Sequence, residues 1–395
     1  MSNIRNKFIK PFTIPVACLS ALAIPAFADQ AEHTQEGESV KLKQVQYKIG
    51  GRIQLDYDYF DGVHNQDNSG SGSEMRRGRI FFKSALTPNW GAKMQLEVND
   101  RKKEAELKDA YVRYKSGKGF DLTIGKAKES FGLETIESAN YVATIERAMI
   151  SDAFAPSRSY GLGFFGQRGN VSLAGGVYAD NQTETNRDTY AWTGRVTYAP
   201  RFGKNAFIHL GLAGSFRDFD GNDYQIKKTA EVHLANKIVQ SAITQADNIT
   251  LLGLESAVVF GPLSVRAEYM KAAINSVSDS GDSGASDADY DGYYIQADYF
   301  LTGETLSYKR GHFNVFNPKS AHNAWQLVTR FSQIDLADND KGIEANNITL
   351  GVNHYVNSQI RLSANYILTD VKGPDTEELG KKNANALSLR LQYLF

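Results

Sequence analysis

Closely spaced arginines are the residues of this chain best suited to chemistry. Arg76, Arg77 and Arg79 are separated only by one glycine, and Glu74 is the sole acid close to them in sequence. Guanidinium groups match phosphate through two parallel hydrogen bonds, and rings of Arg or Lys in a pore favour anions over cations. The cluster therefore indicates a place that attracts small anions. Pairing of these charges across neighbouring strands is the alternative.

A second basic group stands at the start of a long segment, 129–157, which has helix-like pieces and mixed charges. If this segment folds into a channel, the bases around it stand at the narrowest point, where a low dielectric strengthens each charge. A surface position for about half of them is the alternative. The candidate anion-binding, pore-lining residues are Arg52, Arg76, Arg77, Arg79, Lys126, Lys128 and Arg147.

Alternating segments must position these residues. In 52–59 and 387–395 nearly every second side chain is apolar or aromatic, a period of two that gives a strand one apolar and one hydrated face. Most of these segments have roughly the 9–11 residues that a tilted strand needs to cross a bilayer. Sixteen of them start near residues 47, 75, 91, 105, 119, 158, 170, 189, 205, 249, 263, 291, 323, 346, 359 and 385.

The connections alternate between short turns, such as 87–89, and long polar loops, such as 60–74 and 218–248. An even strand number with loops sorted by length predicts an all-β fold, a transmembrane antiparallel up-and-down β-barrel of about 16 strands. Its third extracellular loop, 129–157, is expected to fold inward as a constriction. Sixteen strands leave an aqueous channel. The final Phe395 lies on the apolar face, so we expect contact with outer-membrane lipid and with the barrel-assembly machinery.

The hydrated faces of these strands are predicted to line the channel. They carry more bases than acids, although the whole chain has 44 Lys and Arg against 45 Asp and Glu. That overall balance argues against nucleic-acid binding. The bases on the hydrated faces are Arg52, Arg77, Arg79, Lys83, Lys93, Arg113, Arg195, Arg217, Arg266, Arg330, Arg361 and Arg390. The acids are Asp56, Asp58, Glu97, Asp109, Asp121, Glu255, Glu268 and Asp298.

The first 28 residues are expected to be a signal peptide. Basic residues are followed by an apolar run and by a small-residue exit that ends at Ala28. A polar lead (29–46) and the barrel (47–395) complete the predicted organisation. Export and a membrane barrel together place the protein in the outer membrane of a Gram-negative bacterium. The single cysteine, Cys18, lies in the signal peptide, so no disulfide is expected.

Five stretches carry a resemblance to a known family. They are 51–56, 75–80, 107–112, 124–134 and 308–311. With these motifs the chain resembles the phosphate-selective porin O/P family from about residue 47 to residue 395. The resemblance implies a sixteen-stranded barrel, a homotrimer, an inward-folded third loop, and an arginine ladder with a lysine cluster that guides phosphate.

By motif, Arg52, Arg76 and Arg77 match the ladder, and Lys126 and Lys128 lie in the constriction-loop motif. The later arginine-dense strand of phosphate-specific members has no equally dense counterpart. Its region here contains Arg195, Arg201 and Arg217. The expected function is an outer-membrane porin for small hydrophilic solutes that prefers anions, including phosphate or polyphosphate. A weakly selective general diffusion porin is the alternative.

Other motifs argue less for chemistry. The glycine motif 161–166 has no helix after it, so it is interpreted as barrel wall rather than a nucleotide site. The acidic loop 279–291 lacks the flanking helices of a calcium loop, and calcium binding there stays open. A barrel lipid hydrolase needs a nucleophile and a base, and outward-facing His354 has no evident serine partner. We therefore predict no enzyme activity, no cofactor and no metal centre.

Overall fold

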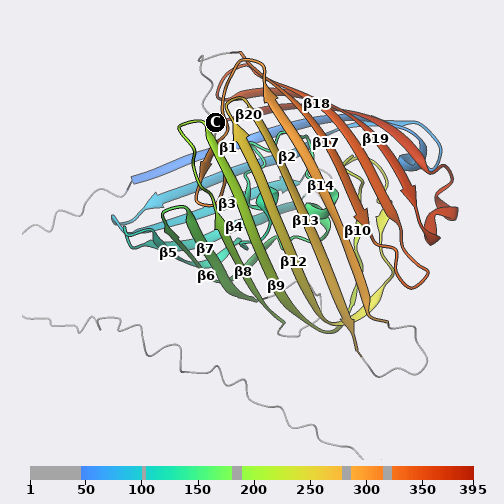
Figure 1. Cartoon of the computed structure of the whole chain (residues 1–395), viewed down its shortest axis with the longest axis horizontal. Coiled ribbons are helices and arrows are strands. Elements are labelled where there is room, and N and C mark those ends of the chain that lie inside the picture. Colours follow the sequence, from blue (N-terminus) through green and yellow to red (C-terminus); the bar gives the residue numbers. More distant parts are fainter. Residues whose placement is uncertain (1–45, 100–103, 180–188, 278–285, 315–322) are drawn as a thin grey trace, which may run out of the picture. The chain divides into compact units, whose positions relative to one another are not determined.

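Sixteen antiparallel strands close into a barrel in which each strand pairs with the next barrel strand along the chain (Figure 1). Closure comes from the pairing of the first strand with the last. The computed structural model describes residues 46–99, 104–179, 189–277, 286–314 and 323–395. The predicted signal peptide and the predicted lead, except Gln46, lie outside the described residues.

The sixteen-stranded up-and-down architecture is confirmed, and every predicted strand start lies within five residues of an observed one. The barrel strands are β1 (Gln46–Phe60), β2 (Gly70–Ala85), β3 (Trp90–Asn99), β4 (Glu104–Lys115), β5 (Phe120–Lys128), β6 (Arg158–Arg168), β7 (Val171–Ala179), β8 (Tyr190–Tyr198), β9 (Ala206–Tyr224), β12 (Thr244–Phe260), β13 (Leu263–Ser276), β14 (Ala288–Phe300), β17 (Ala324–Asp335), β18 (Glu344–Tyr355), β19 (Ile360–Lys372) and β20 (Asn383–Leu394).

Two small hairpins and a few helical turns occupy the connections. The hairpins are β10 (Lys227–Lys228) with β11 (Val239–Gln240), and β15 (Ser307–Lys309) with β16 (His312–Asn314). The helical turns are η2 (Gly62–Asn65), α1 (Leu133–Ile136), α2 (Met149–Ala153) and η3 (Pro374–Leu379). Among the described residues, no helix combines the length and the apolar character needed to cross a membrane.

The period of two sorts the side chains as expected. Along β20, Leu389 and Leu391 expose 41% and 43% of their surface on the outer face, whereas Arg390 between them exposes 3%. Outward apolar groups suit acyl chains, and inward polar groups suit a hydrated bore. The same alternation runs through β8 and β12.

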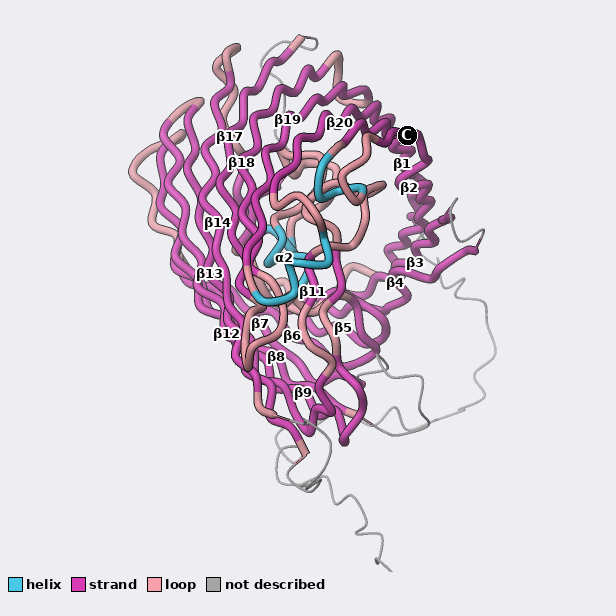
Figure 2. The backbone as a smooth tube through the Cα atoms, turned by 90° about the vertical axis from the view of Figure 1, so that its right-hand side faces the viewer, coloured by secondary structure: helices cyan, strands magenta, loops and turns pink. Residues whose placement is uncertain are grey.

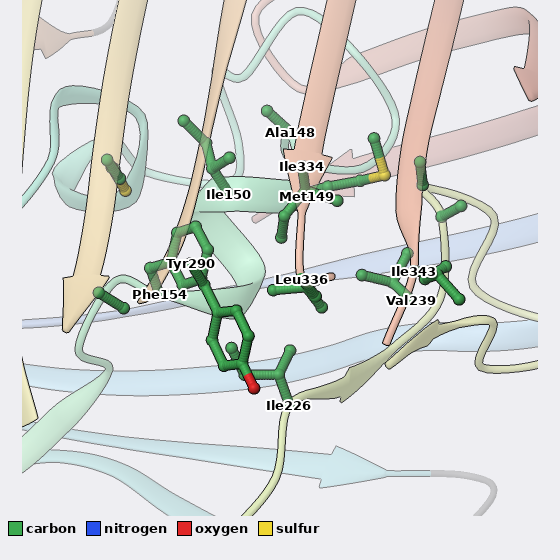
Figure 3. Close-up of a cluster of buried hydrophobic side chains, with 14 of the residues drawn as sticks. Ala148, Met149, Ile150, Phe154, Ile226, Val239, Tyr290, Ile334, Leu336 and Ile343 are labelled. Carbon is green, nitrogen blue, oxygen red and sulfur yellow. The ribbon is translucent and has the colours of Figure 1, made fainter. Parts of the chain in front are cut away.

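Part of the bore is nevertheless filled by an apolar core, which the alternation does not predict. Two connections enter the barrel, the segment 129–157 after β5 and the segment 225–243 after β9 (Figure 2). Their side chains pack against inward residues of β14 and of the β17–β18 corner (Figure 3). The labelled members are Ala148, Met149, Ile150, Phe154, Ile226, Val239, Tyr290, Ile334, Leu336 and Ile343.

This core decides where the channel runs. Ile150 is fully buried, and its Cγ2 occupies the position that a side chain at Gly292 of β14 would need. The filled part of the bore thus lies beside β14, β17 and β18. The large internal cavity is bounded instead by β1 to β8. The water-filled path is therefore off-centre, between this wall and the segment 129–157.

Ile150→Ala tests the role of the core. Truncating a buried isoleucine side chain typically costs about 2–5 kcal/mol. Here the loss should weaken the packing of the loop 129–157 against the barrel wall and not the hydrogen bonds between the strands. We expect single-channel conductance to rise and to become noisier, while the heat-induced mobility shift of the barrel on gels stays unchanged. Leu389→Ala, on the outer face, is the control. Unchanged conductance in Ile150→Ala would show that the core does not set the width of the channel.

Candidate functional site

A cavity of about 660 Å³ occupies the bore beside β1 to β8. Its wall includes Gly161 and Gly163, the first two glycines of the motif on β6. A Cβ added to Gly161 would lie 2.2 Å from the carbonyl oxygen of Val177, so the position accepts no side chain. The motif is thus part of the barrel wall, and it gives the cavity a flat side next to the loop.

The charges around this cavity are strongly biased. Its carboxylates are Asp109 and Glu129. Its bases come from seven strands, from the loop 129–157 and from the β15–β16 hairpin. They are Lys48, Arg52, Arg79, Lys83, Lys93, Arg113, Lys128, Arg147, Arg158, Arg195 and Arg310.

A constriction separates this cavity from a smaller one. The second cavity, of about 250 Å³, lies beyond the loop and is lined by Phe219, Tyr224 and the loop residues 151–157. Three side chains line both cavities, namely Lys128, Arg147 and Arg158. An ion that passes between the two cavities must therefore pass these three bases.

Two of the three bases have no carboxylate partner among the described residues. Lys128 Nζ donates to the carbonyl oxygens of Thr135 and Glu137, at 2.5 and 3.0 Å. Arg147 donates from Nε to the carbonyl oxygen of Glu134 at 3.0 Å, and from Nη2 to that of Glu137 at 2.9 Å. Carbonyl dipoles fix these groups in place but leave their formal charges uncompensated. The loop end is thereby held, and the constriction stays positive.

Arg158 differs, because it shares a carboxylate. Its Nε lies 2.7 Å from Asp109 Oδ1, and Lys93 pairs with the other oxygen of the same carboxylate. One negative charge thus serves two positive ones on this side of the constriction. Arg52 donates to the side-chain oxygen of Asn140, a neutral partner. The balance at the constriction therefore remains positive.

Four of the five acids of the loop pair with arginines of the barrel wall. Glu146 meets three guanidinium groups, with Arg76 at 3.0 Å, Arg77 at 3.3 Å and Arg390 at 2.8 Å. Burial alone disfavours the charge of Glu146, but the three arginines outweigh it and hold the pKa of this carboxyl well below its usual range. Glu146 therefore anchors the loop to β2 and β20 as a fully charged group.

Three further carboxylates of the loop anchor it to other strands. Glu129 binds Arg217 of β9 at 3.0 Å, and Glu134 binds Arg330 of β17 at 3.3 Å. Glu137 binds Arg266 of β13 at 2.8 Å. The loop thus reaches strands far from β5 and β6, the two strands between which it begins and ends. The remaining acid of the loop, Asp152, is exposed.

A β-bulge explains how two consecutive arginines reach the same carboxylate. Strict alternation would turn Arg76 toward lipid if Arg77 faces inward. In the β1–β2 ladder, Gln54 pairs with Arg77 but Leu55 pairs with Met75, so Arg76 is the extra residue. A bulge of this kind re-aims one side chain and locally bends the strand. Both guanidinium groups therefore face Glu146.

The predicted site residues divide into three groups. Arg52, Arg79, Lys128 and Arg147 line the main cavity. Arg76 and Arg77 do not line it and hold Glu146 instead. Lys126 is not brought to the channel, because it shares the outward parity of Ile124 and its Nζ lies 5.5 Å from the ring of Tyr160, which is exposed on the outer face.

Two elements of the site were not predicted as parts of it. The segment 225–243 was interpreted as part of a surface loop, yet its Glu231 lies inside the barrel and pairs with Arg330. Arg310 was noted only within a family motif, yet it lines the main cavity. In the sequence, the connection 303–322 is much longer than a short turn such as 87–89, and this length was the available signal for Arg310. The segment 225–243 is richer in apolar residues, such as Ile226 and Ile238, than the acidic loop 279–291, and this was the available signal for its inward course.

Residues 47–395 match the sequence family described as phosphate-selective porin O and P. This chain belongs to that family. Porin O of Pseudomonas aeruginosa is 24% identical over a 437-residue alignment that covers 96% of this chain and 98% of the relative. The chain is therefore a porin, an outer-membrane β-barrel channel of the Gram-negative type.

Solved porin structures show the same fold. An anion-selective porin from Comamonas acidovorans aligns with 89% of this porin and 100% of its own chain, at 12% identity and a TM-score of 0.55. The trimer form of OmpT, an outer membrane protein of Vibrio cholerae, aligns with 89% of this porin and 99% of its own chain, at 11% identity and a TM-score of 0.55. At these identities the likeness concerns the fold.

The acidic loop 279–291 lies partly outside the described residues. Of its described acids, Asp289 pairs with Lys271 at 3.0 Å, and Asp291 accepts a hydrogen bond from Tyr269 at 2.8 Å. Within the described ranges of the porin, no group of three metal-binding side chains gathers.

Glu146→Gln tests the anchoring of the loop. Removing one partner of a buried ion pair costs about 3–5 kcal/mol, and here three arginines lose their carboxylate. We expect faster proteolysis within 129–157 and a larger chloride-to-potassium permeability ratio. Asp340→Asn, at an exposed turn that lines neither cavity, is the control and is expected to behave like the natural protein. Equal proteolysis in both variants would contradict the anchoring role.

The pH dependence of the channel follows from the same carboxyl. A group whose pKa is lower in the folded state contributes stability above its unfolded pKa, about 4.3 for glutamate, and loses it only as the pH falls through the lower folded value. The anchor at Glu146 should therefore persist at pH 4. Burial raises the pKa of Glu137, another anchor of the loop, so the test is made in Glu137→Gln. We expect its open-channel conductance, measured at constant chloride, to be the same at pH 7 and pH 4. A sharp rise between these values would contradict the lowered pKa.

Proposed function

We propose that this porin is a diffusion channel for small hydrophilic solutes that prefers anions, and that inorganic phosphate is among them. The observation that carries the proposal is the constriction, where neither Lys128 nor Arg147 pairs with a carboxylate among the residues that the structure describes. In a narrow, low-dielectric passage each uncompensated charge acts strongly on a passing ion. Rings of Lys and Arg are a common source of anion selectivity.

The donors at the constriction bear on how tightly an anion is held. Lys128 gives its three N–H groups to the carbonyl oxygens of Thr135, Ile136 and Glu137. It attracts an anion mainly through charge. Arg147 keeps its Nη1 group for direct contact, since only Nε and Nη2 bind other groups in the described part of the chain. We therefore infer selection of anions as a class, with phosphate bound more weakly than at a site of several free guanidinium groups.

The descriptions of related proteins agree with a preference for anions. The family is described as phosphate-selective, and one structural neighbour is described as anion-selective. A weakly selective general porin is the second candidate, and a specific observation favours it. Asp109 and Glu129 also line the cavity, and Asp109 compensates part of the charge of Arg158 and Lys93.

We also propose that the channel has no hydrolase activity. His354, the outward base considered for lipid hydrolysis, stacks on Trp325 at 4.2 Å between ring centroids and shares a hydrogen bond with Asn323 at 2.7 Å. Neither partner is a nucleophile. A homotrimer embedded in outer-membrane lipid is the assembly we propose, with the exposed C-terminal Phe395 addressing the assembly machinery. OmpT in its trimer form is one precedent for the fold.

Lys128→Ala tests the proposed selectivity, and Lys126→Ala is a matched control two residues away on the outer face. In a KCl gradient we expect the reversal potential of Lys128→Ala to show a chloride-to-potassium permeability ratio several-fold lower, because the constriction loses a charge. Lys126→Ala should keep the natural ratio.

Because Lys128 also holds the loop end, Arg113→Ala provides a second test. Arg113 lines the cavity, and its Nε donates to Thr123 of the adjacent strand rather than to the loop. A smaller loss of anion preference is expected. Cation selectivity of the natural protein would refute the proposal. An equal effect of Lys126→Ala and Lys128→Ala would refute the assigned site.

A further inference from the structure

The connection between β14 and β17 enters the bore as a short hairpin, 307–314, formed by β15 and β16. Its two turn residues, Arg310 and Gly311, have φ angles of 58° and 76°. This pair of left-handed residues is what a two-residue type I′ turn requires, and Asn, Asp or Gly usually occupies the first position. An arginine at that position is therefore unusual and needs an explanation.

The backbone of the hairpin is held firmly on its inner side. Tyr308 Oη lies 2.6 Å from His209 Nδ1, and the carbonyl oxygen of Gly311 accepts a hydrogen bond from Arg195 at 2.7 Å. Phe313 is buried in an apolar cluster with Phe207. These contacts fix the main chain, so the hairpin presents the side chain of Arg310 from a rigid support.

The guanidinium of Arg310 is held much more loosely. It lies over the ring of Phe165, 3.8 Å from the ring centroid, and its Nη2 is 2.7 Å from Asp121 Oδ2. That carboxylate oxygen accepts no hydrogen bond of good geometry, so the contact is a charge pair without alignment. About a third of the Arg310 side chain is exposed. Its Nε and Nη1 have no partner within the described ranges and are left for another ligand.

Arg310 also stands between two cavities. It lines the main cavity of about 660 Å³ and a separate one of about 300 Å³ at the short-turn end of β6 to β8. Short turns mark the periplasmic end of such barrels. The lining of this periplasmic cavity contains Arg201, Lys309 and Arg310 and no carboxylate. Arg310 thus occupies the same kind of position as the three bases of the constriction, at the opposite end of the main cavity.

We propose that Arg310 is a second anion-selecting residue of the channel, which binds an oxyanion such as phosphate as it passes between the main cavity and the periplasmic cavity. The inference rests on the proposed anion preference and adds a distinct site to it. The free Nε and Nη1 groups lie on different sides of the guanidinium, so each can donate a single hydrogen bond to a passing oxyanion, while the charge of the group supplies the attraction. Asp121 tempers the affinity of Arg310, as a conducting site requires, since an ion that is bound too tightly does not leave.

The test uses two substitutions with opposite expected effects. Purified full-length porin is inserted into planar bilayers in KCl, and inorganic phosphate is added to one side to block the chloride current. Insertion direction is identified by a membrane-impermeant thiol reagent acting on Lys341→Cys, at an exposed turn of the long-loop end. With phosphate on the periplasmic side, Arg310→Ala should raise the half-blocking concentration about fivefold, and Asp121→Asn should lower it about threefold. Phosphate on the other side should be affected less than twofold.

Two controls separate a role in binding from a role in folding. Arg310→Lys keeps the positive charge but not the planar set of N–H donors, so its affinity for phosphate should lie between those of Arg310→Ala and the natural protein. Arg168→Ala removes a base from a nearby periplasmic turn and lines neither cavity, so it should match the natural protein. Every variant is first required to show the natural heat-modifiable gel mobility.

The outcomes distinguish this inference from the proposed function. Anion selectivity in the natural protein with no side-dependent change in Arg310→Ala overturns the role of Arg310 alone. The same holds if Asp121→Asn and Arg310→Ala shift the half-blocking concentration in the same direction. Cation selectivity in the natural protein overturns the proposed function itself, whatever the variants show.

Discussion

Ion pairs between a loop and the opposite wall hold this channel in shape. Glu129, Glu134, Glu137 and Glu146 each bind an arginine that projects inward from a distant strand. Desolvating such charges is costly unless each finds its partner, so the loop has few alternatives to this position once the pairs have formed. The position of the loop in turn fixes where the two cavities meet and which bases stand between them.

The same pairs sort the charges of the loop by sign. Its four glutamates pair with arginines of the wall, whereas Arg147 lines both cavities together with Lys128 and Arg158. A segment that is acidic in composition thereby becomes a positive surface for a solute. The apolar core of Ile150 and its neighbours supports this arrangement from behind and confines the open path to the β1–β8 side of the bore.

The barrel was predictable from the sequence because alternation is a local signal. Strand positions, the inward set of charges and the barrel-wall role of the glycine motif all follow from it. The interior was less predictable. A base that faces the water of the channel and a base that pairs with an acid of the loop look alike in sequence. The sequence therefore places Arg76 and Arg77 in one group with Arg52. Their partner lies about seventy residues further on, and the bulge that turns Arg76 inward leaves no clear mark in the alternation.

Lys126 and the segment 225–243 show two further limits. Lys126 and Lys128 share the outward parity of β5, but Lys128 turns to the loop 129–157 where the strand ends. The alternation alone therefore does not separate the two lysines. The apolar residues of the segment 225–243 suit a buried position, but its course inside the barrel depends on single contacts such as Glu231 with Arg330. Contacts between residues 99 positions apart have no periodic signature.

Dissolved salt should act very differently on the two classes of charge described above. The Debye length shortens from about 10 Å at 0.1 M to about 3 Å at 1 M, and buried pairs are screened far less than groups in contact with solvent. High salt will therefore weaken the preference for anions over cations that the water-facing bases produce. The buried glutamate–arginine pairs that hold the loop will stay intact. A change of ionic strength alone can thus remove the ion selectivity of the channel and leave the position of its loop unchanged.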